Sequence, residues 1–276
     1  MRKSLVFFFL LIVFSSCSKQ FIQVFDTSTT NTIFKDQYYI YETDTIKITY
    51  SFWASKGVMS FAVFNKLDKP IYIDWKNSSF ITNDNKLNYW IEETQTNIVS
   101  YYGGYFYNGA ILKPGVTIQQ GIQMASSTTI KLEKVTFIPP KSNYYRSQFY
   151  LLPGQHCKLK KDSQSEIVSR NDNPDSKTKI YSDNFTIHNS PLRFRNFLAV
   201  TFAENSQQFV FIDNGFFVSS VKEMDYRHFQ GKFLREDGAG NFIYEEPFTK
   251  STSFFIRIDY TQSGEYRDND AKLYGE

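Results

Sequence analysis

Hydrophobic and polar residues alternate along much of this chain, with the period of two that is typical of β-strands with one buried face. The clearest stretch covers residues 46–75, where turn residues separate three alternating runs: 46–52, 59–63 and 71–75. We expect three antiparallel strands that form a meander, with Ile48, Phe61 and Ile73 on the buried face. Phe64 falls on the second face of its run. A three-stranded meander cannot bury its apolar face alone, so the pattern requires a second sheet.

Shorter alternating runs continue through the rest of the chain and predict further strands. They cover residues 38–41, 87–91, 116–124, 130–138, 145–151, 180–187, 192–202, 209–212, 216–221 and 254–260. Asp213-Asn214-Gly215 and residues 237–241 have the composition of turns, and residues 222–230 suit a short helix. Short strands at this spacing predict an all-β fold, an antiparallel β-sandwich.

Four segments lack the alternation and set the expected domain limits. Residues 1–16 form an apolar leader, residues 17–35 a polar tether, and residues 261–276 a polar tail that we expect to be flexible. The sandwich domain then covers residues 36–260 and contains a long polar insertion at residues 155–179. A polar segment of that length offers little to bury, so we expect a surface loop there.

The leader has the organisation of a signal peptide. Arg2 and Lys3 precede an unbroken apolar run of ten residues, Leu5 to Phe14. Ten residues would span only ~15 Å as a helix, against ~30 Å of hydrocarbon in a bilayer. We therefore expect a cleaved signal peptide and not a membrane span.

A cysteine follows the leader directly. The sequence FSSC at residues 14–17 resembles the lipobox of bacterial lipoproteins. This resemblance implies a diacylglycerol group on Cys17, cleavage before that residue, and acylation of the new amino group. Two or three acyl chains, at ~0.8 kcal/mol per buried methylene, would anchor the protein stably to a membrane. The alternative is an ordinary signal peptide in which the cysteine occurs by chance.

Two further resemblances concern the fold and the cellular location. The stretches FAVFNKLDKPIYIDW (61–75) and VTFIPPKS (135–142) resemble immunoglobulin-like modules of secreted bacterial proteins. With KITYSFWASKG (47–57) and NSPLRFRN (189–196), most of the mature chain resembles uncharacterised lipoproteins of gut-dwelling Gram-negative anaerobes. The resemblance implies a lipid anchor in the outer membrane, and that group has no established activity. The first acid after Cys17 is Asp26, which favours a periplasm-facing position over surface display.

Composition and charge exclude several classes of function. The leader holds two bases and no acid, so the net charge falls from +3 to +1 without it, and nucleic-acid binding is not expected. Once Cys17 is acylated, Cys157 has no partner for a disulfide. The histidines and cysteines lack the spacing of a zinc site, and we expect neither a metal nor a cofactor.

No pattern in the sequence indicates catalytic residues. His156 and Cys157 are adjacent, and adjacent side chains on an extended chain point to opposite sides, whereas a catalytic pair must converge. The same argument applies to the carboxylate pairs Glu92-Glu93 and Glu245-Glu246, which we expect to be solvated.

The strongest candidate for a contact surface is a tyrosine-rich, glycine-containing segment at residues 101–109. Its candidate contact residues are Tyr101, Tyr102, Tyr105 and Tyr107. Tyrosine rings suit stacking on sugars or packing on a protein partner, although the same rings could pack over one end of the sandwich. A second, basic patch of Lys158, Lys160 and Lys161 is either solvated or in contact with anionic lipid headgroups.

These observations lead to two hypotheses of different classes. The first is a lipid-anchored, non-enzymatic module of the outer membrane, held by acyl chains on Cys17, that binds an envelope protein or a glycan or serves in envelope assembly. The second is an envelope hydrolase or glycan-processing enzyme whose site is assembled from residues far apart in the chain.

Overall fold

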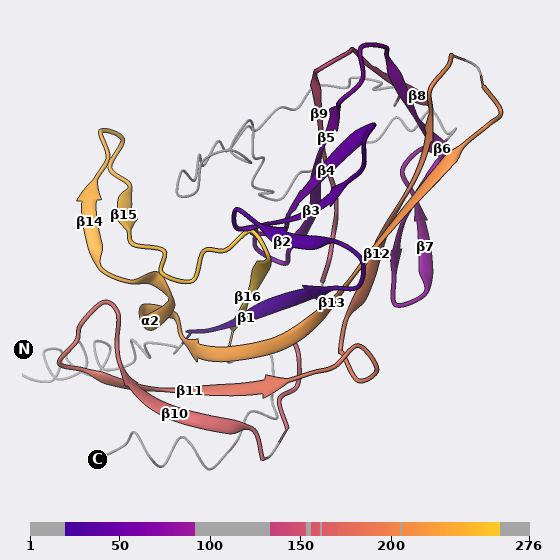
Figure 1. The fold of residues 1–276 in the computed structure, drawn as a ribbon. Helices are drawn as coiled ribbons and strands as arrows, with labels where there is room; N and C mark the ends of the chain where they lie inside the picture. Colours follow the sequence, from indigo (N-terminus) through magenta and orange to yellow (C-terminus); the bar gives the residue numbers. More distant parts are fainter. Residues whose placement is uncertain (1–19, 92–132, 153–155, 161, 205, 260–276) are drawn as a thin grey trace, which may run out of the picture.

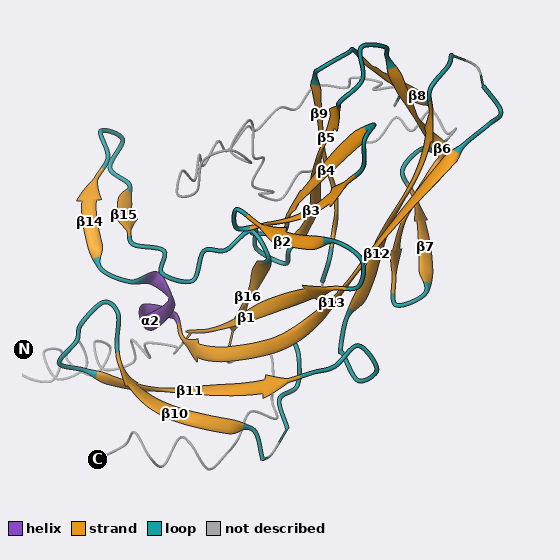
Figure 2. Ribbon diagram, in the orientation of Figure 1, coloured by secondary structure: helices purple, strands orange, loops and turns teal. Residues whose placement is uncertain are grey.

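The computed structural model describes residues 20–91, 133–152, 156–160, 162–204 and 206–259 (Figure 1). Nearly all of the regular structure in this part of the chain is β-strand (Figure 2). The elements are β1 (Gln20–Thr29), β2 (Ile33–Lys35), β3 (Tyr38–Glu42), β4 (Ile46–Ser51), β5 (Val58–Asn65), β6 (Ile71–Thr82), β7 (Asn85–Asn88), β8 (Val135–Ile138), β9 (Asn143–Tyr150), β10 (Gln164–Ser169), β11 (Lys177–Asn184), β12 (Arg193–Thr201), β13 (Val210–Asp225), α2 (Tyr226–Gln230), β14 (Phe233–Glu236), β15 (Phe242–Tyr244) and β16 (Ser253–Asp259). The paired strands are antiparallel, which confirms the predicted all-β, antiparallel class.

The larger sheet has nine strands and is strongly curled into a half-barrel (Figure 1). Its order is β10-β11-β13-β12-β6-β7; β1 joins β13 to β16, and β8 pairs with β6. The 16-residue strand β13 lies at the centre of this sheet. Different parts of one of its edges pair with β11 and β12, and the other edge pairs with β1. A smaller sheet of five strands has the order β2-β3-β4-β5-β9.

The expected three-stranded meander is wrong in one respect. The first two runs pair as β4 and β5, but the third run lies in β6, which belongs to the larger sheet. The chain crosses between the sheets at a corner organised by Asn65, which is fully buried. Its Nδ2 donates to the carbonyl oxygens of Lys69, Ile138 and Pro139 at 2.8, 3.2 and 3.0 Å. Pro70 follows and has no N–H with which to continue the ladder.

The buried face of the three runs is nevertheless as predicted. Ile48, Phe61 and Ile73 are all 0% exposed and belong to one aromatic-rich core between the two sheets. Rings from both sheets contact each other there: Tyr50 and Phe216 have centroids 4.9 Å apart, and Phe52 and Phe194 have centroids 5.2 Å apart. Each such ring buries ~150–250 Å² of surface, so this core supplies much of the driving force for folding.

The expected tether at residues 17–35 is wrong for residues 20–29. These residues form β1, which is paired on both edges, with β13 and β16. The physical reason is that Ile22, Gln23, Val24 and Phe25 are buried in succession. A strand covered on both faces shows no alternation of polar and apolar residues, and β1 therefore lacks the pattern that identified the other strands.

The polar segment 155–179 is also not a plain loop. Residues 164–169 form β10, and β11 begins at Lys177, so the two make a hairpin at the edge of the larger sheet. Five of the six residues of β10 are exposed, which is compatible with polar composition. Asp213-Asn214-Gly215 lies inside β13 and is not a turn. Asn214 is fully buried there, and its Oδ1 accepts a 2.8 Å hydrogen bond from the Tyr50 hydroxyl.

Two local predictions are confirmed. The amide of Asp237 donates to the carbonyl oxygen of Asn241, which closes the turn between β14 and β15. A short helix, α2, occurs within residues 222–230, and Asp225 caps it by accepting from the Arg227 amide. The leader, the strand expected at 116–124 and the tail at 261–276 lie outside the described residues.

Candidate functional site

The lipid-attachment and tyrosine contact residues expected from sequence lie outside the described part of the chain, whereas Lys158 and Lys160 of the expected basic patch lie within it. The residues outside it are Cys17, where the sequence predicts lipid attachment, and the tyrosine-rich segment with Tyr101, Tyr102, Tyr105 and Tyr107. The described residues instead present a pocket that the sequence analysis did not name.

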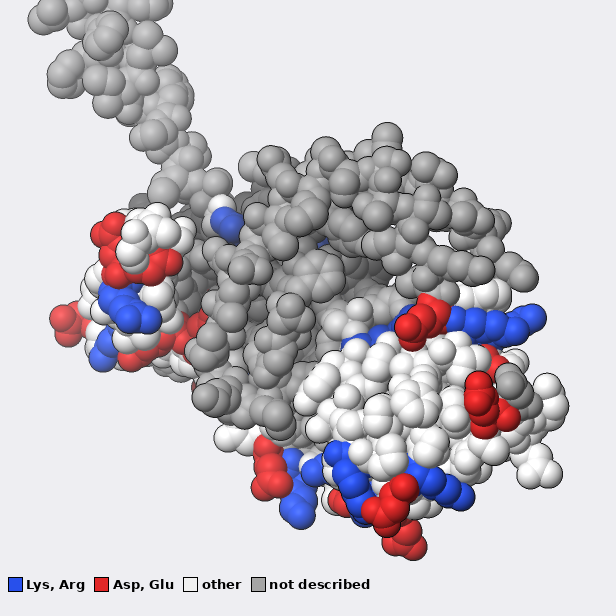
Figure 3. Space-filling model, turned by 90° about the horizontal axis from the view of Figure 1, so that it is seen from above, with Lys and Arg blue, Asp and Glu red and all other residues white. Residues whose placement is uncertain are grey.

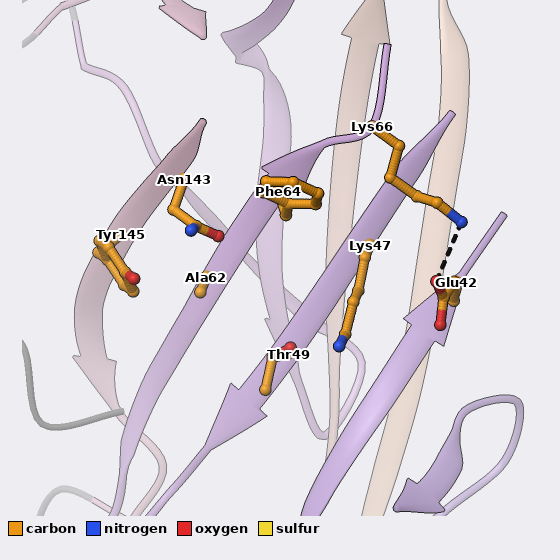
Figure 4. A pocket seen from close by; sticks show the side chains of 8 residues that line it. All are labelled: Glu42, Lys47, Thr49, Ala62, Phe64, Lys66, Asn143 and Tyr145. Carbon is orange, nitrogen blue, oxygen red and sulfur yellow. Dashed lines mark hydrogen bonds and ion pairs between the residues drawn. The ribbon is translucent and has the colours of Figure 1, made fainter. Parts of the chain in front are cut away.

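This pocket lies on the outer face of the five-stranded sheet and has a volume of ≈ 390 Å³ (Figure 4). Pockets of ~300–1,000 Å³ are the usual size for small-molecule sites. It is lined by Glu42, Lys47, Thr49, Ala62, Phe64, Lys66, Asn143 and Tyr145. These residues come from β3, β4, β5, the residue after β5, and β9.

Strand register explains why these side chains converge. Lys47, Phe64 and Asn143 form one row across β4, β5 and β9, and they point to the face opposite the core. The next row consists of Thr49, Ala62 and Tyr145. Ala62 contributes only a methyl group, which leaves room beside the larger rings of Phe64 and Tyr145. The pocket therefore combines two aromatic side chains with amide and hydroxyl groups.

Two lysines at the pocket differ in their partners. Lys66 Nζ lies 3.0 Å from Glu42 Oε1 and donates to the Thr43 carbonyl oxygen at 2.8 Å (Figure 4). The hydrogen bond from Lys66 lowers the pKa of the exposed Glu42 carboxyl, so this carboxylate is ionised at neutral pH. Lys47 forms no ion pair with any residue in the described ranges, and its side chain extends along the sheet toward Thr49. The pocket lining thus holds two lysines and one carboxylate, and Glu42 lies opposite Lys47 across β3 and β4.

One signal in the sequence pointed toward this pocket. Phe64 is a large aromatic residue on the otherwise polar face of an alternating strand. Such a residue either packs under another element or contributes to a binding surface. The partners from β9 could not be found from sequence, because no local pattern pairs β5 with a strand so far away. Asn143, the first residue of β9, lies 79 positions after Phe64 in the chain.

Cys157 and His156 do not form an activated nucleophile. The backbone of Cys157 is held by Gln23, whose Oε1 accepts from the Cys157 amide at 2.8 Å and whose Nε2 donates to its carbonyl oxygen at 2.7 Å. Burial, with smaller contributions from Asp183 and Glu223, raises the pKa of the thiol to about 11. The thiol is therefore protonated at neutral pH, whereas the thiolate is the nucleophilic form.

The other histidines and carboxylates have structural or exposed positions. His228 is 4% exposed, and its Nδ1 accepts a hydrogen bond of 3.2 Å from the Asn171 amide. Burial lowers the pKa of His228, which keeps the ring neutral at physiological pH. Glu245 and Glu246 are exposed. Within the described ranges, no group of three histidine, cysteine or acidic residues could hold a metal ion.

Comparisons with known proteins give no match: no protein family, no curated protein and no solved structure resembles this chain closely enough to be reported. In the part of the chain that the structure covers, no helix has the length and apolar character needed to cross a membrane.

Proposed function

We propose that this protein is a lipid-anchored, non-enzymatic binding module of the outer membrane, and that the pocket on the five-stranded sheet binds a glycan. The observation that carries this proposal is the pairing of Phe64 and Tyr145 with polar groups in one pocket on an outer sheet face. Aromatic rings stack on the apolar faces of sugar rings, while hydroxyl and amide groups bond to the sugar hydroxyls.

The polar lining suits a sugar in detail. Asn143 can both donate and accept through its amide, Thr49 contributes a hydroxyl, and Lys47 contributes an ammonium group. The lining carries one more cation than carboxylate, and this excess positive charge beside hydroxyl-binding groups favours a sugar that carries a carboxylate or phosphate substituent. Glycans with acidic substituents are thus the preferred ligands within this proposal.

The fold and the membrane anchor belong to the same proposal. An immunoglobulin-like β-sandwich is supported by the two sheets that share one core and by the crossover at Asn65, which moves the chain from one sheet to the other. The lipobox-like sequence before Cys17 supports the anchor. The pocket lies at the Phe64 end of β5. The opposite end of the strand, at Val58, lies ~20 Å away and is the end that approaches β16. This position leaves the pocket away from the N-terminal end of β1.

The pocket is tested by direct binding. Purified protein should bind acidic oligosaccharides on a glycan array, and Phe64→Ala and Tyr145→Ala should each weaken binding by about tenfold or more, since a stacked ring contributes ~1–2 kcal/mol. Tyr150→Ala is the matched control, because Tyr150 lies on the same strand with 40% exposure against 43% for Tyr145, and outside the pocket. Equal binding by all three variants would exclude the pocket as the site.

The anchor is tested separately. Cys17→Ala should abolish metabolic labelling with a palmitate analogue and leave the precursor uncleaved, because the lipoprotein signal peptidase acts on the acylated cysteine. Cys157→Ala should be labelled normally. If Cys17→Ala is processed and released as a soluble protein, the lipid anchor is wrong.

A further inference from the structure

In the described part of the chain, the β14–β15 hairpin exposes large apolar side chains. Phe233, Leu234 and Phe242 are 54%, 56% and 62% exposed, and every residue of β14 is exposed. Phe233 contacts two rings of β15, with centroids 5.8 Å from Phe242 and 5.7 Å from Tyr244. This forms an aromatic cluster on one face of the hairpin, and Leu234 lies on the other face.

The hairpin is a small sheet of its own. β14 and β15 pair only with each other among the described strands, and Figure 1 shows them standing away from the two larger sheets. An isolated two-stranded hairpin is marginally stable in water. Exposed aromatic and leucine side chains on such an element are typical of a surface that contacts another apolar phase.

The base of this hairpin lies beside the first residues of β1. β14 begins two residues after Gly231, the C-cap of α2. Arg257 connects α2 to the start of β1: its guanidinium lies over the Tyr226 ring at 5.2 Å and donates to the Gln20 side chain. In Figure 1 the hairpin, α2 and the start of β1 are all at the left of the molecule.

Cys17 precedes Gln20 by only three residues. Three residues span at most ~10 Å even when fully extended. This step rests on the proposed function: if Cys17 carries acyl chains, the membrane surface lies within that distance of the start of β1. The hairpin base would then be held next to the lipid headgroups.

We propose that the β14–β15 hairpin is a second membrane contact, which lies along the lipid interface with the face that carries Phe233 and Phe242 among the lipids. Aromatic side chains favour this interfacial zone. The turn at Asp237 to Asn241 is polar and internally hydrogen-bonded, so the hairpin lies flat and does not enter the bilayer tip first.

The charges of the hairpin indicate the kind of lipid. Residues 232–246 contain two bases, Lys232 and Arg235, and four acids, Glu236, Asp237, Glu245 and Glu246. Figure 3 shows charges of both signs at this end of the molecule, around uncharged side chains. Attraction to anionic headgroups is therefore weak, and the contact depends on apolar burial in zwitterionic lipid. The anchor keeps the hairpin at a high local concentration next to the membrane, so a few apolar side chains are sufficient for lipid binding. A specific complex with a free protein partner would need ~1,000 Å² of buried interface.

The test uses the acylated protein in vesicles of phosphatidylethanolamine and phosphatidylcholine that contain brominated acyl chains, which quench nearby tryptophan. Phe242→Trp should add fluorescence that falls about twofold or more in brominated vesicles relative to unbrominated ones. Phe34→Trp is the matched control, because Phe34 is 64% exposed on β2 of the other sheet. Its added fluorescence should not change. Quenching of this kind should also be insensitive to 0.5 M salt.

Four outcomes would overturn the inference. If mass spectrometry shows the acyl groups and neither tryptophan is quenched, the hairpin does not contact lipid although the anchor is correct. Equal quenching at both positions would mean that the hairpin has no preferred contact. A chain that carries no acyl groups would refute the anchor and this inference together. If Phe242→Trp is shielded only in native envelopes, the hairpin contacts a protein, and the lipid assignment is wrong.

Discussion

The two large sheets differ in how they are assembled from the chain. In the five-stranded sheet, β2 to β5 are consecutive and are joined by short connections. In the nine-stranded sheet, β1 pairs with β13 and β16, so Phe21 lies opposite Asp225 and Ile258. The first sheet is local in sequence, whereas the second needs its strands to be brought together from both ends of the described chain.

This difference does not make the local sheet independent. Among the described residues, its inner face packs against the nine-stranded sheet, and aromatic residues of both sheets form one core. Tyr50 of β4 shows this directly, because its hydroxyl donates to Asn214 and accepts from Asn196, both of the other sheet. We therefore expect the two sheets to unfold together, and the following predictions test that expectation with protein lacking residues 1–17.

The largest effect is expected in the shared core. Phe61→Ala and Phe216→Ala, one in each sheet, should each lower the free energy of unfolding by ~3–5 kcal/mol, because each removes a buried ring and leaves a cavity. Phe61 is 0% and Phe216 2% exposed. Urea unfolding followed by tryptophan fluorescence and far-UV circular dichroism should give a single transition for both variants. Phe211→Ala, at an exposed position of β13, should cost less than ~0.5 kcal/mol. Separate transitions for the two probes would show that the sheets are independent.

Gly57→Ala should have the next largest effect, at the place where the two sheets meet. Gly57 has a φ of +63°, and an added Cβ would lie 2.7 Å from Cγ of Phe254, a fully buried residue of β16. We expect a loss of ~2–4 kcal/mol from backbone strain and overpacking. Gly238→Ala has no atom within 4 Å of the added Cβ and should leave the melting temperature unchanged. A stable Gly57→Ala variant would mean that the contact between β5 and β16 is not close-packed.

Tyr50→Phe tests the polar contact between the sheets. The substitution keeps the ring and leaves the buried amides of Asn214 and Asn196 without the hydroxyl that each contacts, at 2.8 and 3.1 Å. We expect a loss of ~1–3 kcal/mol in urea unfolding. The control Tyr145→Phe, whose side chain is 43% exposed, should be neutral. If both variants behave alike, the network does not couple the sheets.

The smallest effect concerns His228, which contacts Asn171 and Phe248 outside the sheets. Its pKa is lowered by burial, so the unfolded chain binds a proton more readily than the folded protein. The stability that neutral His228 provides is therefore present above pH ~6.5 and is lost as the pH falls below that value toward its lower folded pKa. His228→Asn should reduce the fall in melting temperature between pH 7 and 5.5, whereas His188→Asn, at an exposed position, should not. An unchanged pH profile would exclude a stabilising role for the neutral ring.

The candidate site shows how far the sequence reaches. Phe64 could be noticed because an aromatic residue on a polar face breaks the local pattern. Tyr145 and Asn143 join it only because β9 adds to the edge of β5 after the intervening residues, and no local pattern specifies that pairing. The turn of the protruding hairpin, at residues 237–241, was recognisable from sequence. The exposure of its strands was not, because it depends on how the rest of the chain packs.

The sequence by itself determined the all-β class, the buried face of Ile48, Phe61 and Ile73, and the turn at residues 237–241. These features follow from backbone geometry over a few residues, since side chains on a strand alternate and turns need particular residues. Only the tertiary structure decided that residues 71–75 join the opposite sheet, that residues 20–29 form a central strand, and that Asn214 is buried within β13. Each of these depends on burial against distant parts of the chain, and a residue covered on both sides carries no alternation to mark it.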